Sequence, residues 1–241
     1  MTVSVVGGPA SAGIATTATS TRLVRAAEQL WAAHGIDAVS LREINRVAGA
    51  KNASALQYHF GDRDGLLRAV LAKHHGSVEA RRHAMLDAYE AAATADLRAL
   101  AGALVRPLAA KLADADGGPD YLQIFADLMN RPRPLISRAE RDDPASSTFR
   151  WRTAVAALLD HDATRLHRRF VAIRFTAVEL AHRARGAPHA DDRLFTSHLV
   201  DLVAGLLAAP LSEETLRLDA QRPPRPTEPV LAPVATEIAG G

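Results

Sequence analysis

The chain has 241 residues, of which 48% are hydrophobic and 23% charged, and it contains no cysteine. A chain of this size and composition can bury a sizeable core. The lack of cysteine excludes a disulfide framework, a thiolate zinc site and a cysteine nucleophile. No segment reaches the roughly 18 consecutive apolar residues of a membrane span. The first 21 residues carry no charge, so we expect no signal peptide and a cytoplasmic protein.

The formal net charge of +2 is unevenly distributed along the chain. Residues 22–75 contain eight Lys and Arg against five Asp and Glu, whereas the rest of the chain carries 21 basic and 22 acidic residues. A basic N-terminal segment ahead of a nearly neutral remainder indicates a polyanionic partner.

Helical patterns begin close to the N-terminus, and signals for β-strands are absent. A first helix is expected at 21–34, capped by Thr21 and ended by Gly35, because a helix end commonly needs a residue that tolerates positive φ. A second is expected at 41–48, where Ser40 is the N-cap and Glu43 completes a capping box. A turn at Gly49, a short helix at 52–60, a break at Gly61 and a long helix at 64–92 follow.

Further helices are expected across the rest of the chain, at 96–113, 121–130, 146–159, 163–185 and 192–209. Beyond Pro210 the sequence becomes rich in proline, which disfavours a stable helix. We therefore expect an all-α protein in which a three-helix head precedes a larger helical domain. The expected divisions are a flexible arm, a DNA-binding head, a helical body and a disordered tail, at residues 1–20, 21–75, 76–212 and 213–241.

The most informative stretch is residues 40–60, SLREINRVAGAKNASALQYHF. A capped helix, a glycine turn and a second short helix at this spacing are typical of a helix-turn-helix. The second helix can enter the major groove, where base edges present distinct donors and acceptors. Asn52 and Gln57 can each form paired hydrogen bonds with adenine, and small residues such as Ser54 allow a close approach.

Several polar side chains around this motif are candidates for holding DNA phosphates, contacts that fix register and supply much of the affinity. They are Ser40, Lys51, Tyr58, His59 and Arg63. Arg42 and Arg46, on the first helix of the motif, fit either a phosphate contact or an ordinary solvated helix face.

Residues 21–75 resemble the TetR family of transcription regulators. The resemblance rests on the Leu30-Trp31 to Gly35 helix end, the Ser40–Ile44 segment, Ala48-Gly49, Tyr58–Gly61 and Leu66-Leu67. One more residue separates Gly49 from Phe60 than in the commonest family pattern, which leaves open which face of the second helix reads the bases. The arm before Arg22 has no Lys or Arg, so we do not expect it to enter the minor groove.

The resemblance implies a homodimer in which the last two long helices pair with their copies in a four-helix bundle. Apolar stripes on these helices are consistent with such a face, because soluble proteins avoid exposing them. The candidate interface residues are Val171, Phe175, Val178, Leu199, Leu202, Val203 and Leu206. Two heads held in this way fit a palindromic operator.

The resemblance also implies an effector pocket in the body. The candidate lining residues are Tyr121, Phe125, Leu128, Met129, Trp151 and Phe175. Each of them fits plain helical core as well. The apolar character of this set favours a small, mostly apolar effector, and the resemblance favours a repressor that the effector releases from DNA.

Motifs for catalysis or cofactor binding are absent from the sequence, so neither an enzyme nor a cofactor is expected. His161 and His167 are six residues apart, which places them on different helix faces without an evident third metal ligand. Two other classes remain open: a helical enzyme with a vestigial head, and an adaptor that uses the helix-turn-helix surface to bind a protein. The enzyme would turn over a small substrate without salt-sensitive duplex binding, whereas the adaptor would keep its function in Lys51→Ala and Tyr58→Phe variants.

Overall fold

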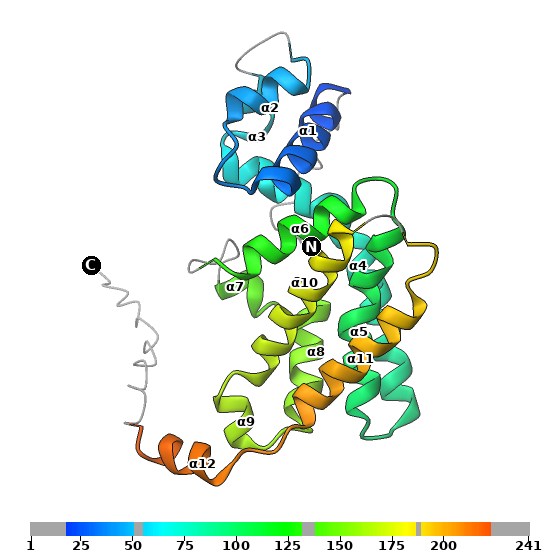
Figure 1. Cartoon of the computed structure of the whole chain (residues 1–241), viewed down its shortest axis with the longest axis vertical. Coiled ribbons are helices and arrows are strands. Elements are labelled where there is room, and N and C mark those ends of the chain that lie inside the picture. Colours follow the sequence, from blue (N-terminus) through cyan, green and yellow to red (C-terminus); the bar gives the residue numbers. More distant parts are fainter. Residues whose placement is uncertain (1–17, 51–54, 132–137, 187–188, 223–241) are drawn as a thin grey trace, which may run out of the picture. The chain divides into compact units, whose positions relative to one another are not determined.

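The computed structural model describes residues 18–50, 55–131, 138–186 and 189–222, and every regular element among them is a helix (Figure 1). The expectation of an all-α fold is therefore confirmed. Described residues up to Ala209 form one compact unit, and those from Pro210 onward form another.

The head consists of α1 (Ala18–His34), α2 (Leu41–Val47) and α3 (Ala55–Phe60), followed by the first turns of α4 (Arg63–Ala92). Apolar side chains from all four helices pack into one core. Its fully buried members include Leu23, Trp31, Ile36, Ile44, Leu56, Leu66 and Leu67. This core holds α3 against α1 and α4, and so fixes the direction in which the outer side of α3 points.

The N-cap residue and the glycines around the helix-turn-helix have the conformations that the sequence predicts. The Ser40 hydroxyl accepts a hydrogen bond from the Glu43 backbone N–H at 3.1 Å. Gly35 and Gly49 adopt φ of +85° and +61° at the ends of α1 and α2. Helix α1 begins at Ala18 rather than at Thr21, because Ser20 and Leu23, one turn apart, are both buried.

The body is built from the remaining length of α4 together with α5 (Leu97–Ala109), a 3-10 turn η1 (Ala110–Ala113) and α6 (Gly118–Met129). The short helix α7 (Arg138–Arg141) and then α8 (Ser147–Ala156) follow. Helices α4, α5, α6 and α8 surround the main hydrophobic core together with α10 (Arg168–Arg185) and α11 (Arg193–Ala208). Trp151 is fully buried there, and its indole N–H donates to the Leu100 carbonyl at 2.8 Å.

The helix expected at 163–185 is broken into α9 (His161–Arg165) and α10 (Arg168–Arg185). His167, between them, adopts φ of +60°, in the left-handed region. Long-range hydrogen bonds anchor the first residues of α10. Arg168 donates to the Leu207 carbonyl at 3.1 Å, and Arg169 donates to the Arg152 carbonyl at 2.7 Å. These tertiary contacts override the continuous helical pattern of the sequence.

Helix α11 (Arg193–Ala208) packs against α10 and α5. A further helix, α12 (Glu213–Ala220), occupies the start of the expected disordered tail, so that expectation is wrong for this segment. Ser212 caps it by accepting the Thr215 N–H at 3.2 Å, and Glu213 and Glu214 lie at the positive end of its dipole. The run of prolines begins only at Pro223, outside the described residues.

In the part of the chain that the structure describes, no single helix is long and apolar enough to cross a membrane. Helices α11 and α12 satisfy the length and composition criteria only when they are taken together.

We expect Gly117→Ala to destabilise the protein, because Gly117 has φ of +84° and an added Cβ would lie 2.8 Å from Glu28 Oε2. A left-handed conformation alone costs a non-glycine residue about 1–2 kcal/mol. Gly76→Ala is the matched control, since nothing lies within 4 Å of its Cβ position in α4, and it should stabilise by up to about 1 kcal/mol. Urea unfolding at one fixed protein concentration measures both, and equal midpoints for the two variants would contradict the packing described for Gly117.

Candidate nucleic-acid interface

Helix α3 has an anchored inner side and an exposed outer side. Leu56 is 2% exposed and Phe60, one turn later, is half-buried, and both belong to the head core. Gln57 is exposed, and Tyr58 is 86% exposed. The exposed Tyr58 ring and the Gln57 side-chain amide beside it give α3 a surface that can contact a partner.

The Tyr58 ring is held by its neighbour. His59 is half-buried, and the two ring centroids lie 5.1 Å apart with their planes at 77°, an edge-to-face arrangement. The Tyr58 hydroxyl and the ring N–H of His59 can each donate a hydrogen bond to a phosphate oxygen.

The N-terminal end of α2 adds polar groups to this surface. Ser40 and Arg42 are exposed, and Ser40 also serves as the N-cap. Arg46 lies one turn after Arg42 and forms a loose ion pair with Glu43 at 3.8 Å. Its side chain is 74% exposed, so this pair contributes little and leaves the guanidinium accessible.

Arg63, expected to hold a phosphate, has a structural contact. It is half-buried, and its guanidinium donates to the Ile36 carbonyl in the loop between α1 and α2. Arg22 has a similar role that the sequence pattern did not reveal, donating to the Ala48 carbonyl at 3.2 Å. Both arginines thus hold the helix-turn-helix in place through backbone acceptors.

Three of the predicted DNA contacts, Lys51, Asn52 and Ser54, lie outside the described residues. The other described candidates lie on or beside α2 and α3, two helices of the head that contact each other: Ser40, Arg42, Gln57, Tyr58 and His59.

The six candidate effector residues do not form one group. Tyr121 and Trp151 are buried in the body core, with Phe125 and Phe175 partly buried against it. Leu128 belongs to the head core, and Met129 packs at its edge. Burial raises the pKa of Tyr121 to about 12, so its hydroxyl stays neutral at physiological pH.

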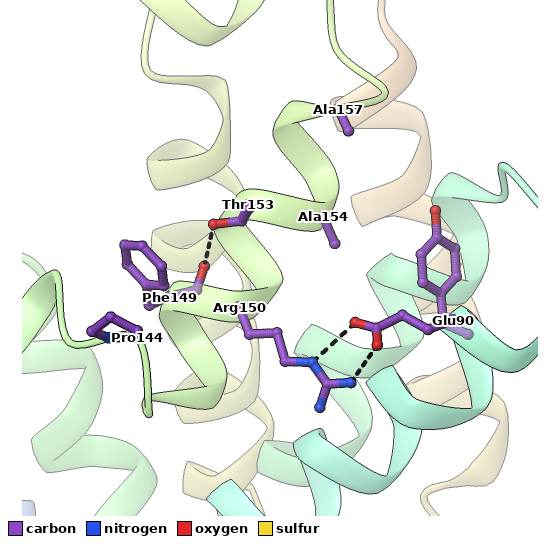
Figure 2. Close-up of a pocket in the computed structure, with 8 residues that line it drawn as sticks. Glu90, Pro144, Phe149, Arg150, Thr153, Ala154 and Ala157 are labelled. Carbon is purple, nitrogen blue, oxygen red and sulfur yellow. Dashed lines mark hydrogen bonds and ion pairs between the residues drawn. The ribbon is translucent and has the colours of Figure 1, made fainter. Parts of the chain in front are cut away.

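A separate hollow of about 380 Å³ opens between the C-terminal part of α4 and α8 (Figure 2). Its wall is mostly apolar and consists of Tyr89, Glu90, Pro144, Phe149, Arg150, Thr153, Ala154 and Ala157. None of these residues was singled out from the sequence. The sequence signal at this place is weak: Phe149 is followed by the small residues Ala154, on α8, and Ala157, the C-cap of that helix.

The charges in this hollow are paired with each other. Arg150 donates to both carboxylate oxygens of Glu90, at 3.0 and 2.7 Å (Figure 2). It also lies 2.6 Å from Asp87. The hydrogen bond from Arg150 lowers the pKa of the Glu90 carboxyl. Because the ion pairs occupy Arg150, the apolar side chains dominate what the hollow offers a ligand.

The candidate dimer-interface residues differ in how deeply their side chains are buried. Val171, Val178 and Leu202 are 38%, 40% and 44% exposed on α10 and α11, whereas Leu199 and Val203 are buried in the core of the chain itself. Phe175 and Leu206 are intermediate. Phe170 joins the exposed set at 49%; it was missed because its position at the start of α10 depends on the break at His167.

Groups of three or more His, Asp or Glu side chains that could hold a metal ion do not occur among the described residues.

Comparison with known proteins adds family information to this geometry. Residues 23–70 match the model of the bacterial regulatory proteins of the tetR family. No curated protein matches the chain. The matched segment covers α1, α2, α3 and the start of α4, which together form the head with its exposed α3. The head is therefore a helix-turn-helix domain of the kind found in the DNA-binding transcriptional regulators of the tetR family.

Proposed function

We propose that the protein is a homodimeric, cytoplasmic repressor that binds a palindromic operator and is released by a small, mostly apolar effector. The observation that carries the proposal is the outer side of α3, where Gln57 and Tyr58 stand exposed on a helix anchored by Leu56. An amide of this kind can pair with adenine in the major groove, while the tyrosine hydroxyl binds the flanking phosphate.

The dimer proposal is supported by the apolar residues exposed on α10 and α11. Phe170, Val171 and Val178 of α10 and Leu202 of α11 are each between 38% and 49% exposed, and the two helices pack side by side. Burial of such surface against a second copy would remove it from water. A twofold dimer would then present two heads to two half-sites.

The effector proposal is supported by the apolar character of the body. The hollow beside α8 is lined largely by apolar side chains, including Phe149 and Tyr89. Phe125 and Phe175 are partly buried at the edge of the main core. A ligand bound among such residues releases the operator only if it binds one arrangement of the heads more tightly than the other.

The first test is binding of the purified protein to a library of genomic fragments at two salt concentrations, followed by footprinting of the retained fragments. We expect a short palindrome to be enriched, and its affinity should fall steeply with salt because phosphate contacts release counterions. Turnover of a small substrate without salt-sensitive duplex binding would instead favour the helical enzyme, and capture of a protein through the exposed α3 would favour the adaptor.

Substitutions on the head should separate base contacts from phosphate contacts. Gln57→Ala is expected to relax discrimination at one base pair per half-site, with a cost of about 1–3 kcal/mol per contact. Arg42→Ala should weaken binding uniformly across sequences and reduce the salt slope by roughly 1 per half-site.

Arg63→Ala is the comparison variant for Gln57→Ala and Arg42→Ala. The Arg63 guanidinium donates to the Ile36 carbonyl, so its loss should affect the stability of the head. We expect it to lower the thermal stability, whereas Gln57→Ala, at an exposed site, should not. Unchanged base preference in Gln57→Ala would refute the assignment of Gln57 to base reading.

The dimer face is tested by Val178→Glu, which places a charge in the proposed interface. We expect a folded monomer by sedimentation, with helical circular dichroism retained and operator binding lost. Ala88→Glu is the control, since Ala88 is exposed on α4, and it should remain dimeric. A dimeric Val178→Glu variant would rule this face out.

A further inference from the structure

Helix α6 is shared between the head, the body core and α10. Ile124 and Leu128 belong to the head core, and Tyr121 and Leu122 belong to the body core. Ala126 packs with alanines of α10 in a third cluster. The core of the DNA-binding head is therefore completed by a helix of the body.

The C-terminal end of α6 is bonded to the loop between α1 and α2. Asp127 accepts the Ile36 backbone N–H at 3.3 Å, and Arg131, just beyond the helix, lies 2.7 Å from Asp37. Because Asp37 is 83% exposed, the ion pair is weak. The bond to the half-buried Asp127 and the packing of Leu128 are the stronger contacts.

At its N-terminal end, α6 is held through a buried carboxylate of α1. Glu28 is 2% exposed and receives Lys73 Nζ at 2.7 Å and His74 Nε2 at 2.9 Å, both from α4. Lys73 also pairs with Asp116 at 3.2 Å, in the turn that leads into α6. Gly117 in that turn lies so close to Glu28 that a Cβ would meet its carboxylate. The head, α4 and the start of α6 thus meet at one buried charge.

The opposite side of α6 is bonded to α10. Gln123 donates to the Ala181 carbonyl and accepts from Arg185 at 2.6 Å. Gln123 is buried, as are Ala177 and Ala181. A continuous set of buried contacts therefore leads from α10, which carries the proposed dimer face, through α6 to the head.

We propose that Glu28 and Asp127 are positioning residues: by fixing each head on α6, they select the half-site spacing of the operator. This inference rests on the proposed dimeric, operator-binding function. Each added base pair moves the second half-site along the axis and rotates it around the duplex, so heads held rigidly match one spacing only. Heads released from either end of α6 tolerate neighbouring spacings.

The test uses the operator recovered by footprinting and four derivatives, in which the segment between the half-sites is shortened or lengthened by one or two base pairs. Competition binding gives the ratio of affinities for the natural spacing and each derivative. For the wild-type chain we expect a preference of about tenfold or more, and loss of one charged hydrogen bond should reduce it by about tenfold. Glu28→Gln and Asp127→Ala should both show this reduction.

Two controls separate positioning from other effects. Gln57→Ala should weaken binding to every derivative while leaving the spacing ratio unchanged. Asp192→Asn removes a half-buried carboxylate of the body that pairs with Arg183 and not with the head, and it should preserve the ratio as well. If Glu28→Gln fails to fold, the spacing ratio of Asp127→Ala alone tests the proposal. Asp127 is only half-buried, so we expect this variant to fold.

The outcomes distinguish this inference from the proposed function. A wild-type chain that binds no duplex, or binds as a monomer, contradicts the proposed function itself. A wild-type dimer that binds a palindrome with no spacing preference, or variants at Glu28 and Asp127 that keep the full preference, overturns only the role of α6.

Discussion

The burial of α6 on three sides is the constraint on which the placement of the head depends. Ile124 and Leu128 fill the head core, Leu122 fills the body core, and Ala126 packs on α10. Apolar burial of this kind is the main source of folding free energy. Because one helix serves three clusters, a displacement of α6 would open all three, and the described residues up to Ala209 form one compact unit.

The buried carboxylate of Glu28 adds hydrogen bonds of fixed direction to this apolar packing. A carboxylate at 2% exposure is costly unless it is paired and hydrogen-bonded, and Lys73 and His74 supply both partners from α4. His74 is in turn stacked on Tyr121 of α6, with ring centroids 4.6 Å apart. A buried pair of this kind is weak evidence for added stability, but both hydrogen bonds to Glu28 form only when α1 and α4 lie in this arrangement. The head of this regulator is thus attached to its body at a defined position.

Much of the head could be predicted from sequence because its signals are local. The cap at Ser40, the positive φ of Gly35 and Gly49, and the spacing of Leu56 and Phe60 depend on residues within a few positions of each other. The family match to residues 23–70 lies in this same segment.

Features that depend on long-range contacts could not be predicted from the sequence pattern. The break at His167 depends on bonds from Arg168 and Arg169 to distant carbonyls. The roles of Arg22 and Arg63 depend on backbone acceptors 26 and 27 residues away. The candidate effector residues share an apolar character but separate into different cores, since periodicity shows which side of a helix is buried and not which helix covers it.

The most direct test of the account places a photo-crosslinking amino acid at position 57 of the full-length protein bound to its footprinted operator. The exposed outer side of α3 predicts crosslinks to bases in the major groove of both half-sites. The same probe at Arg81, exposed on α4, should give none. Crosslinks at neither position with the operator bound, or crosslinks from position 81 alone, would contradict the claim that α3 reads the DNA.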